Sequence, residues 1–155
     1  MKIKMSKNAL NSRGDIWNAV IHVLVSTDYQ NDSPLFREAS LVFHYYSEVE
    51  SGGHECLLNW QSQNMGEIGI NTYVNHLSSI LLKIGAQDYA AIVTKYGVEM
   101  FEMYIQLENE EITDVEFYKL IEIANSEYEK LESKLDSLLE TYFIQIHTEM
   151  IEVIE

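Results

Sequence analysis

The chain has 155 residues and a formal net charge of −15, and 46% of its residues are apolar. That apolar fraction favours a packed core over disorder, and a lone cysteine, Cys56, excludes an intramolecular disulfide framework. Ten Lys and Arg against 25 Asp and Glu disfavour direct nucleic-acid binding, and no apolar run approaches the ~18 residues of a membrane span.

Residues 1–14 are predicted to form an N-terminal extension, and residues 15–155 are predicted to form one acidic all-α domain. Lysines precede an apolar stretch here, but Asn18 and His22 interrupt it and no small-residue cleavage pattern follows. We therefore reject a signal peptide and expect a cytoplasmic protein. Helical apolar spacing begins after Asp15, which is predicted to be the N-cap of the first helix.

The next helix is predicted to begin at Pro34, because Ser33 followed by proline is a typical helix start. It runs to Gly52-Gly53, where a left-handed cap is expected to end it. A short helix is expected over Glu55–Gln63. Another begins at Asn71 and ends at Gly85, and the same apolar period continues from Tyr89 to Tyr104.

Two capping boxes mark later helix starts, Thr113-x-x-Glu116 and Ser126-x-x-Glu129. After the second, apolar residues recur every three or four positions, as in a helix seam. Strand-like alternation is too short to outweigh this pattern. The fold class expected is all-α, a single-domain bundle of about six or seven helices.

The acidic residues are concentrated in the second half of the chain. Residues 1–76 hold five bases and eight acids, whereas residues 77–155 hold five bases and seventeen acids. On one helix starting at Ser126, four acids would share a face with neighbours roughly 5–6 Å apart: Glu129, Glu132, Asp136 and Glu140. A second cluster comprises Glu108, Glu110, Glu111, Asp114 and Glu116. We predict that Glu108, Glu111 and Asp114, together with the four acids of the row, bind a cationic partner; a merely solvating surface is the plain alternative.

The segment EVESGGHECLLNW, from Glu48 to Trp60, resembles the Glu-Val-x-x-Gly-Gly signature, with a later Asn, of a family of small acidic all-α bacterial domains. That family includes a DNA-mimic protein and many members of unknown function. The segment NHLSSILLKIGAQDYAAIV is similar to the second conserved block of this family, and the resemblance covers roughly Leu35 to Ile146. It implies a protein that occupies the DNA-binding surface of a basic protein, and a homodimer.

The glycine turn is interpreted first as structure. Gly52 and Gly53 are expected to adopt φ > 0, while Glu48 and Asn59 hydrogen-bond the exposed backbone of the turn. The alternative is a polar pocket around Glu48, Gly53 and Asn59 that holds a ligand.

No catalytic, metal or cofactor site is predicted. His54-x-Cys56 is the one close His/Cys pair, and with His44 and Glu55 it matches no standard zinc spacing. No phosphate-binding loop, nucleophile elbow or HExxH motif is present. Tyr96, Tyr104, Tyr118 and Tyr128 lie among the acids, where they suit either core packing or an interface with a basic protein.

The sequence therefore predicts a non-enzymatic acidic interaction protein, in the manner of a DNA mimic, with a basic or DNA-binding protein as its partner and with no membrane or direct nucleic-acid partner. Two alternatives stay open. One is an immunity or antitoxin-type protein that neutralises a cationic toxin, and the other is an enzyme with its pocket at the Gly-Gly turn.

Overall fold

The computed structural model describes residues 2–26 and 33–155. In this part of the chain it contains six α-helices, one short 3-10 helix and two short strands, which confirms the all-α fold class. The elements are, in chain order, β1 (Ile3–Ser6), η1 (Lys7–Leu10), α1 (Arg13–Val25), α2 (Pro34–Ile68), α3 (Ile70–Lys83), α4 (Gln87–Glu108), α5 (Asp114–Glu129), α6 (Lys134–Met150) and β2 (Ile151–Ile154).

The contacts of the chain divide it into two compact units. Unit 1 comprises Met1–Leu41 and Asp136–Glu155, and unit 2 comprises Val42–Leu135. Whether residues 1–14 act as an extension of one acidic domain stays a prediction.

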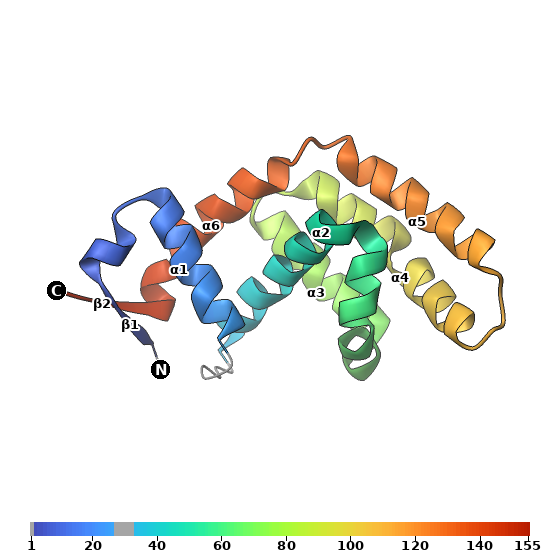
Figure 1. Cartoon of the computed structure of the whole chain (residues 1–155), viewed down its shortest axis with the longest axis horizontal. Coiled ribbons are helices and arrows are strands. Elements are labelled where there is room, and N and C mark those ends of the chain that lie inside the picture. Colours follow the sequence, from blue (N-terminus) through green and yellow to red (C-terminus); the bar gives the residue numbers. More distant parts are fainter. Residues whose placement is uncertain (1, 27–32) are drawn as a thin grey trace. The chain divides into compact units, whose positions relative to one another are not determined.

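Unit 1 joins the two ends of the described chain. β1 and β2 pair in parallel, with Ile3 opposite Ile151 and Ser6 opposite Ile154 (Figure 1). The ring of Trp17 on α1 lies 5.1 Å from that of Phe143 on α6. The strand pair was not expected, because each strand has only four residues and its partner is at the other end of the sequence.

The first helix begins earlier than the sequence indicated. Ser12, not Asp15, is its N-cap, and the Ser12 hydroxyl accepts the Asp15 backbone N–H at 3.1 Å. Asp15 instead lies in the first turn, where a carboxylate also favours the positive end of the helix dipole. The start at Pro34 is confirmed, since the Ser33 hydroxyl accepts the Phe36 N–H at 3.1 Å.

Unit 2 is built from most of α2, from Val42 onward, together with α3, α4 and α5 (Figure 1). α4 packs against both α3 and α5, and its inward residues Tyr89, Val93 and Met100 are buried. The α3 helix ends as predicted: Gly85 has φ 87°, and the Ala86 N–H donates to the Leu81 carbonyl at 2.8 Å.

Candidate functional site

The Gly-Gly turn is a sharp kink inside α2. Gly53 has φ 73° and ψ −166°, a combination open almost only to glycine, as expected. The expected positive φ is wrong for Gly52, which has φ −155° and ψ 22°. A Cβ atom on Gly53 would lie 2.7 Å from Nδ2 of Asn125, so the backbone of the kink approaches α5 too closely for any side chain. The expected break at the glycines is confirmed, but the second helical segment runs past Gln63 to Ile68.

Asn125 caps the kink from α5. Its Oδ1 accepts the backbone N–H of His54 at 2.8 Å and also lies 2.7 Å from Nδ1 of the His54 ring. Because an amide oxygen only accepts, Nδ1 carries the ring proton. His54 is 1% exposed, and burial lowers its pKa below the ordinary value of 6.5, although the bond to Asn125 opposes this.

Glu48 and Asn59 do not bond the backbone of the turn, contrary to expectation. Oε2 of Glu48 accepts the thiol of Cys56 at 3.0 Å, and Oδ1 of Asn59 accepts the hydroxyl of Tyr104 at 3.2 Å. The bond to Glu48 is the main cause that raises the pKa of Cys56 to about 11. The thiol therefore keeps its proton at neutral pH, where cysteine chemistry needs the thiolate.

Sequence reasoning missed Asn125. It lies at core spacing with Ile121, Ala124 and Tyr128, all of which are buried. A polar residue at an inward position of an amphipathic helix was the available signal, because such a side chain needs a hydrogen-bond partner.

A cleft of about 400 Å³ lies beside the kink, and we call it the kink cleft. Oε1 of Glu50 accepts the hydroxyl of Tyr128 at 2.8 Å beside it. Of the residues predicted to form a pocket here, Gly53 lines the cleft but Glu48 and Asn59 do not. The lining residues are Val49, Glu50, Gly52, Gly53, Asn125, Tyr128, Glu129 and Ser133.

The predicted row of acids on one helix is wrong. Ser126 lies inside α5, which ends at Glu129, and α6 begins only at Lys134. Glu132 and Ser133 between them have φ 55° and 58°. The buried Tyr89 hydroxyl accepts the N–H of Leu135, at 3.1 Å, near the new helix start. Because the helix is interrupted between Glu129 and Lys134, the four acids cannot share one helix face.

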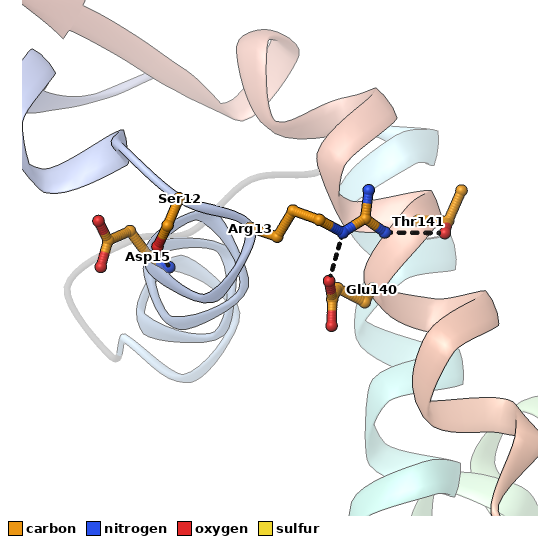
Figure 2. A network of polar contacts seen from close by, with 5 residues as sticks. All are labelled: Ser12, Arg13, Asp15, Glu140 and Thr141. Carbon is orange, nitrogen blue, oxygen red and sulfur yellow. Dashed lines mark hydrogen bonds and ion pairs between the residues drawn. The ribbon is translucent and has the colours of Figure 1, made fainter.

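The four acids of that predicted row are therefore distributed over different elements. Glu129 ends α5 and Glu132 lies in the turn, both in unit 2, whereas Asp136 and Glu140 belong to α6 in unit 1. Oε1 of Glu140 receives a bond from Nε of Arg13 at 2.7 Å, while Nη2 of Arg13 donates to the Thr141 hydroxyl at 3.2 Å (Figure 2). Their role in binding a partner stays a prediction.

The second predicted cluster lies around two tyrosines. The hydroxyl of Tyr118 donates to Oε1 of Glu55 at 2.6 Å, and this bond and nearby Asp114 raise its pKa. Burial raises the pKa of Tyr104, and Glu108 adds to the effect. We call Glu55, Tyr104, Glu108, Asp114 and Tyr118 the tyrosine–carboxylate cluster. Thr113 is the N-cap position of α5, as predicted, but without a side-chain cap bond.

Glu111 and the tyrosines that were predicted to lie among the acids differ in how far they are buried. Glu111 is exposed in the turn before α5, where its N–H donates to the carbonyl of Gln106 at 2.8 Å. Tyr96 and Tyr128 are buried, as core packing requires, whereas Tyr118 is 38% exposed.

Within the described residues, no three His, Cys, Asp or Glu side chains gather as a metal ion requires. A search of the same residues finds no helix long and apolar enough to cross a membrane.

The family model described as DMP19-like protein matches residues 31–147. This range covers all of unit 2 and nearly coincides with the segment from Leu35 to Ile146 that carries the sequence resemblance. The two strands and α1 lie outside it. No curated protein and no solved structure matches the chain.

Proposed function

Because the chain belongs to the DMP19-like protein family, we propose that it is a non-enzymatic DNA mimic that occupies the basic DNA-binding surface of another protein. The family match supports a DNA-mimic type of protein, and we propose a basic or DNA-binding protein as its partner. We also propose that the protein acts in the cytoplasm and, as the resemblance implies, forms a homodimer.

The observation that carries the proposal is how unit 2 holds its carboxylates. Glu50 and Glu55 accept hydrogen bonds from the hydroxyls of Tyr128 and Tyr118, which are neutral donors. Such a bond fixes the direction of a carboxylate without cancelling its charge. Fixed, uncompensated negative charges are what a DNA-binding surface meets along a phosphate backbone.

The proposed contact surface uses the predicted acids unit by unit. Glu108 ends α4, Glu111 lies in the loop that follows, and Asp114 begins α5. Glu129 ends α5 and Glu132 lies in the turn after it, and all five acids belong to unit 2. Asp136 and Glu140 in unit 1 are expected to contribute less, because Arg13 already neutralises part of the charge there.

The test is capture of partners by the full chain from a bacterial lysate, with elution by duplex DNA or by salt rising from about 0.1 to about 0.5 M. A captured DNA-binding protein that duplex DNA releases supports the proposal. A captured nuclease-like toxin that DNA does not release supports the immunity-type alternative instead. Absence of any salt-sensitive partner contradicts both.

Charge reversal then locates the surface. The triple variant Glu108→Lys, Glu111→Lys and Asp114→Lys is expected to reduce capture about tenfold or more, because it replaces attraction with repulsion. The double variant Asp136→Lys and Glu140→Lys should reduce it less. If the triple variant is folded by circular dichroism and still captures the partner fully, the predicted surface in unit 2 is wrong.

A further inference from the structure

We propose that the kink cleft receives the cationic end of a lysine or arginine side chain of the partner. The role of the partner rests on the proposed function, but the cation site itself is a property of unit 2 alone. Its lining combines two carboxylates, two glycines at the kink, the polar side chains of Asn125, Tyr128 and Ser133, and one aliphatic side chain, Val49.

The electrostatics of the cleft favour a positive charge from several sources. α5 ends at Glu129, which lines the cleft. At the kink the first segment of α2 ends and the second begins, so their opposite end charges offset each other there. Each helix C-terminus carries about half a negative elementary charge. The carboxylates of Glu50 and Glu129 add to this field, and no basic residue lines the cleft, although Lys130 and Lys134 are close in sequence.

The Glu50 carboxylate is held in place before any cation arrives. Its partner Tyr128 is 7% exposed and packs edge-on against the rings of Tyr89, His54 and Tyr45, at centroid distances of 5.2, 6.0 and 6.3 Å. Burial and the bond to Glu50 raise the pKa of Tyr128, so its hydroxyl remains a donor at physiological pH. Fixing the carboxylate in advance reduces the entropy lost on binding.

The size of the cleft fits a side chain rather than a bare ion. About 400 Å³ lies within the range of small-ligand sites, and buried Val49 offers an apolar wall to an aliphatic stem. Another cavity in unit 2, among Tyr45, His54 and Tyr73, measures about 20 Å³ and has room for about one water molecule. The kink cleft is therefore the better candidate for an organic ligand.

The test is a titration of the ¹⁵N-labelled full chain with N-acetylarginine amide, followed by amide NMR. N-acetylcitrulline amide is the matched control, because it has nearly the same shape without the charge. We expect saturable shifts at Gly52, Gly53 and Ser133 with the arginine compound, at least about fivefold larger than with the citrulline compound. Equal shifts with both, or shifts spread evenly over all acidic surfaces, would overturn the proposal.

Variants identify the residues responsible. Glu50→Gln and Glu129→Gln should each reduce the affinity for the arginine compound about two- to fivefold. Glu102→Gln, the same change on an exposed part of α4, should leave that affinity unchanged. Tyr128→Phe tests positioning, since it keeps every charge and should still weaken binding. If it disrupts the fold, the Glu50→Gln result decides alone: unchanged affinity there refutes the site.

This titration needs no partner protein, so the two proposals fail separately. Absence of binding rejects the cleft even where a DNA-binding protein is captured. If the arginine compound binds and a captured partner is equally retained by Glu50→Gln and Glu129→Gln variants, the cleft is a cation site but not part of the interface, and its assignment to the partner is rejected.

Discussion

The two units of this protein treat negative charge differently. Unit 2 holds sixteen acids and five lysines, whereas unit 1 holds nine acids and five bases. In unit 1 the carboxylate of Glu140 is met by the guanidinium of Arg13. In unit 2 the carboxylates of Glu48, Glu50 and Glu55 accept from a thiol and two phenols. A positively charged donor offsets the negative charge of a carboxylate, whereas a neutral donor only orients the carboxylate. Unit 2 therefore retains its negative electrostatic field.

The largest effect that separates the two units is expected at glycine. Gly53→Ala in unit 2 forces a side chain into a positive-φ backbone and against Asn125, and should lower the free energy of unfolding by about 3 kcal/mol. Gly14→Ala in helix α1 of unit 1 meets nothing closer than 3.8 Å and should be neutral or stabilising by up to about 1 kcal/mol. Urea unfolding measures both, and similar losses would contradict the kink geometry.

Removing the cap of the kink should cost less than removing the glycine. Asn125→Ala leaves the His54 N–H and ring without their acceptor, with an expected loss of about 1–3 kcal/mol. Ser126→Ala, at the exposed neighbouring position, is the control and should change stability by less than about 0.5 kcal/mol. A loss at Asn125 no larger than the control would show that another group caps the kink.

Acidification should destabilise unit 2 through buried His54. Burial lowers the pKa of His54 in the folded state. Below pH 6.5 the unfolded chain therefore binds a proton at His54 more readily than the folded chain does. The contribution of neutral His54 to the free energy of unfolding is fully present above pH 6.5. It is lost as the pH falls below 6.5, by at most about 1.4 kcal/mol per pH unit. Burial also lowers the pKa of His44, which adds a slope of the same sign.

The measurement for this pH effect is unfolding by urea between about pH 5.5 and 7.5, where carboxylates contribute little. His54→Gln should flatten the slope, and His76→Gln at an exposed position should leave it unchanged. An equally steep profile in His54→Gln contradicts the assignment.

The smallest effect concerns the two kinds of carboxylate bond. Arg13→Gln removes an exposed ion pair, whose side chains are 59% and 34% exposed, and should cost at most about 1 kcal/mol, with less cost at high salt. Tyr118→Phe removes a neutral donor from Glu55 and should cost a similar amount at every salt concentration. Equal salt dependence of the two variants would remove the distinction between the units.

The sequence predicted the helices well because their apolar period and end signals are local. Ser33-Pro34 and Gly85 act within one helical turn, so these helix-end signals can be recognised from the sequence alone. The break at residues 130–133 was missed because it contains neither Gly nor Pro, and the apolar spacing from Tyr128 to Leu135 continues across it.

The candidate site was only partly predictable for the same physical reason. The two glycines are recognised from their own backbone needs. The partners of the kink are distant in sequence: Asn125 lies 71 positions from His54, and Tyr128 lies 78 positions from Glu50. Such pairs depend on how α2 and α5 pack, which no local pattern encodes.

The pairing of β1 with β2 has a consequence for how the protein is made. Unit 2 is one continuous stretch of chain, whereas unit 1 needs β1 and β2, which pair across almost the whole sequence. Closing so long a loop is entropically costly until the intervening chain is compact. β2 is also synthesised after every element of unit 2. On the ribosome, the acidic unit is therefore free to fold first, and unit 1 is completed last.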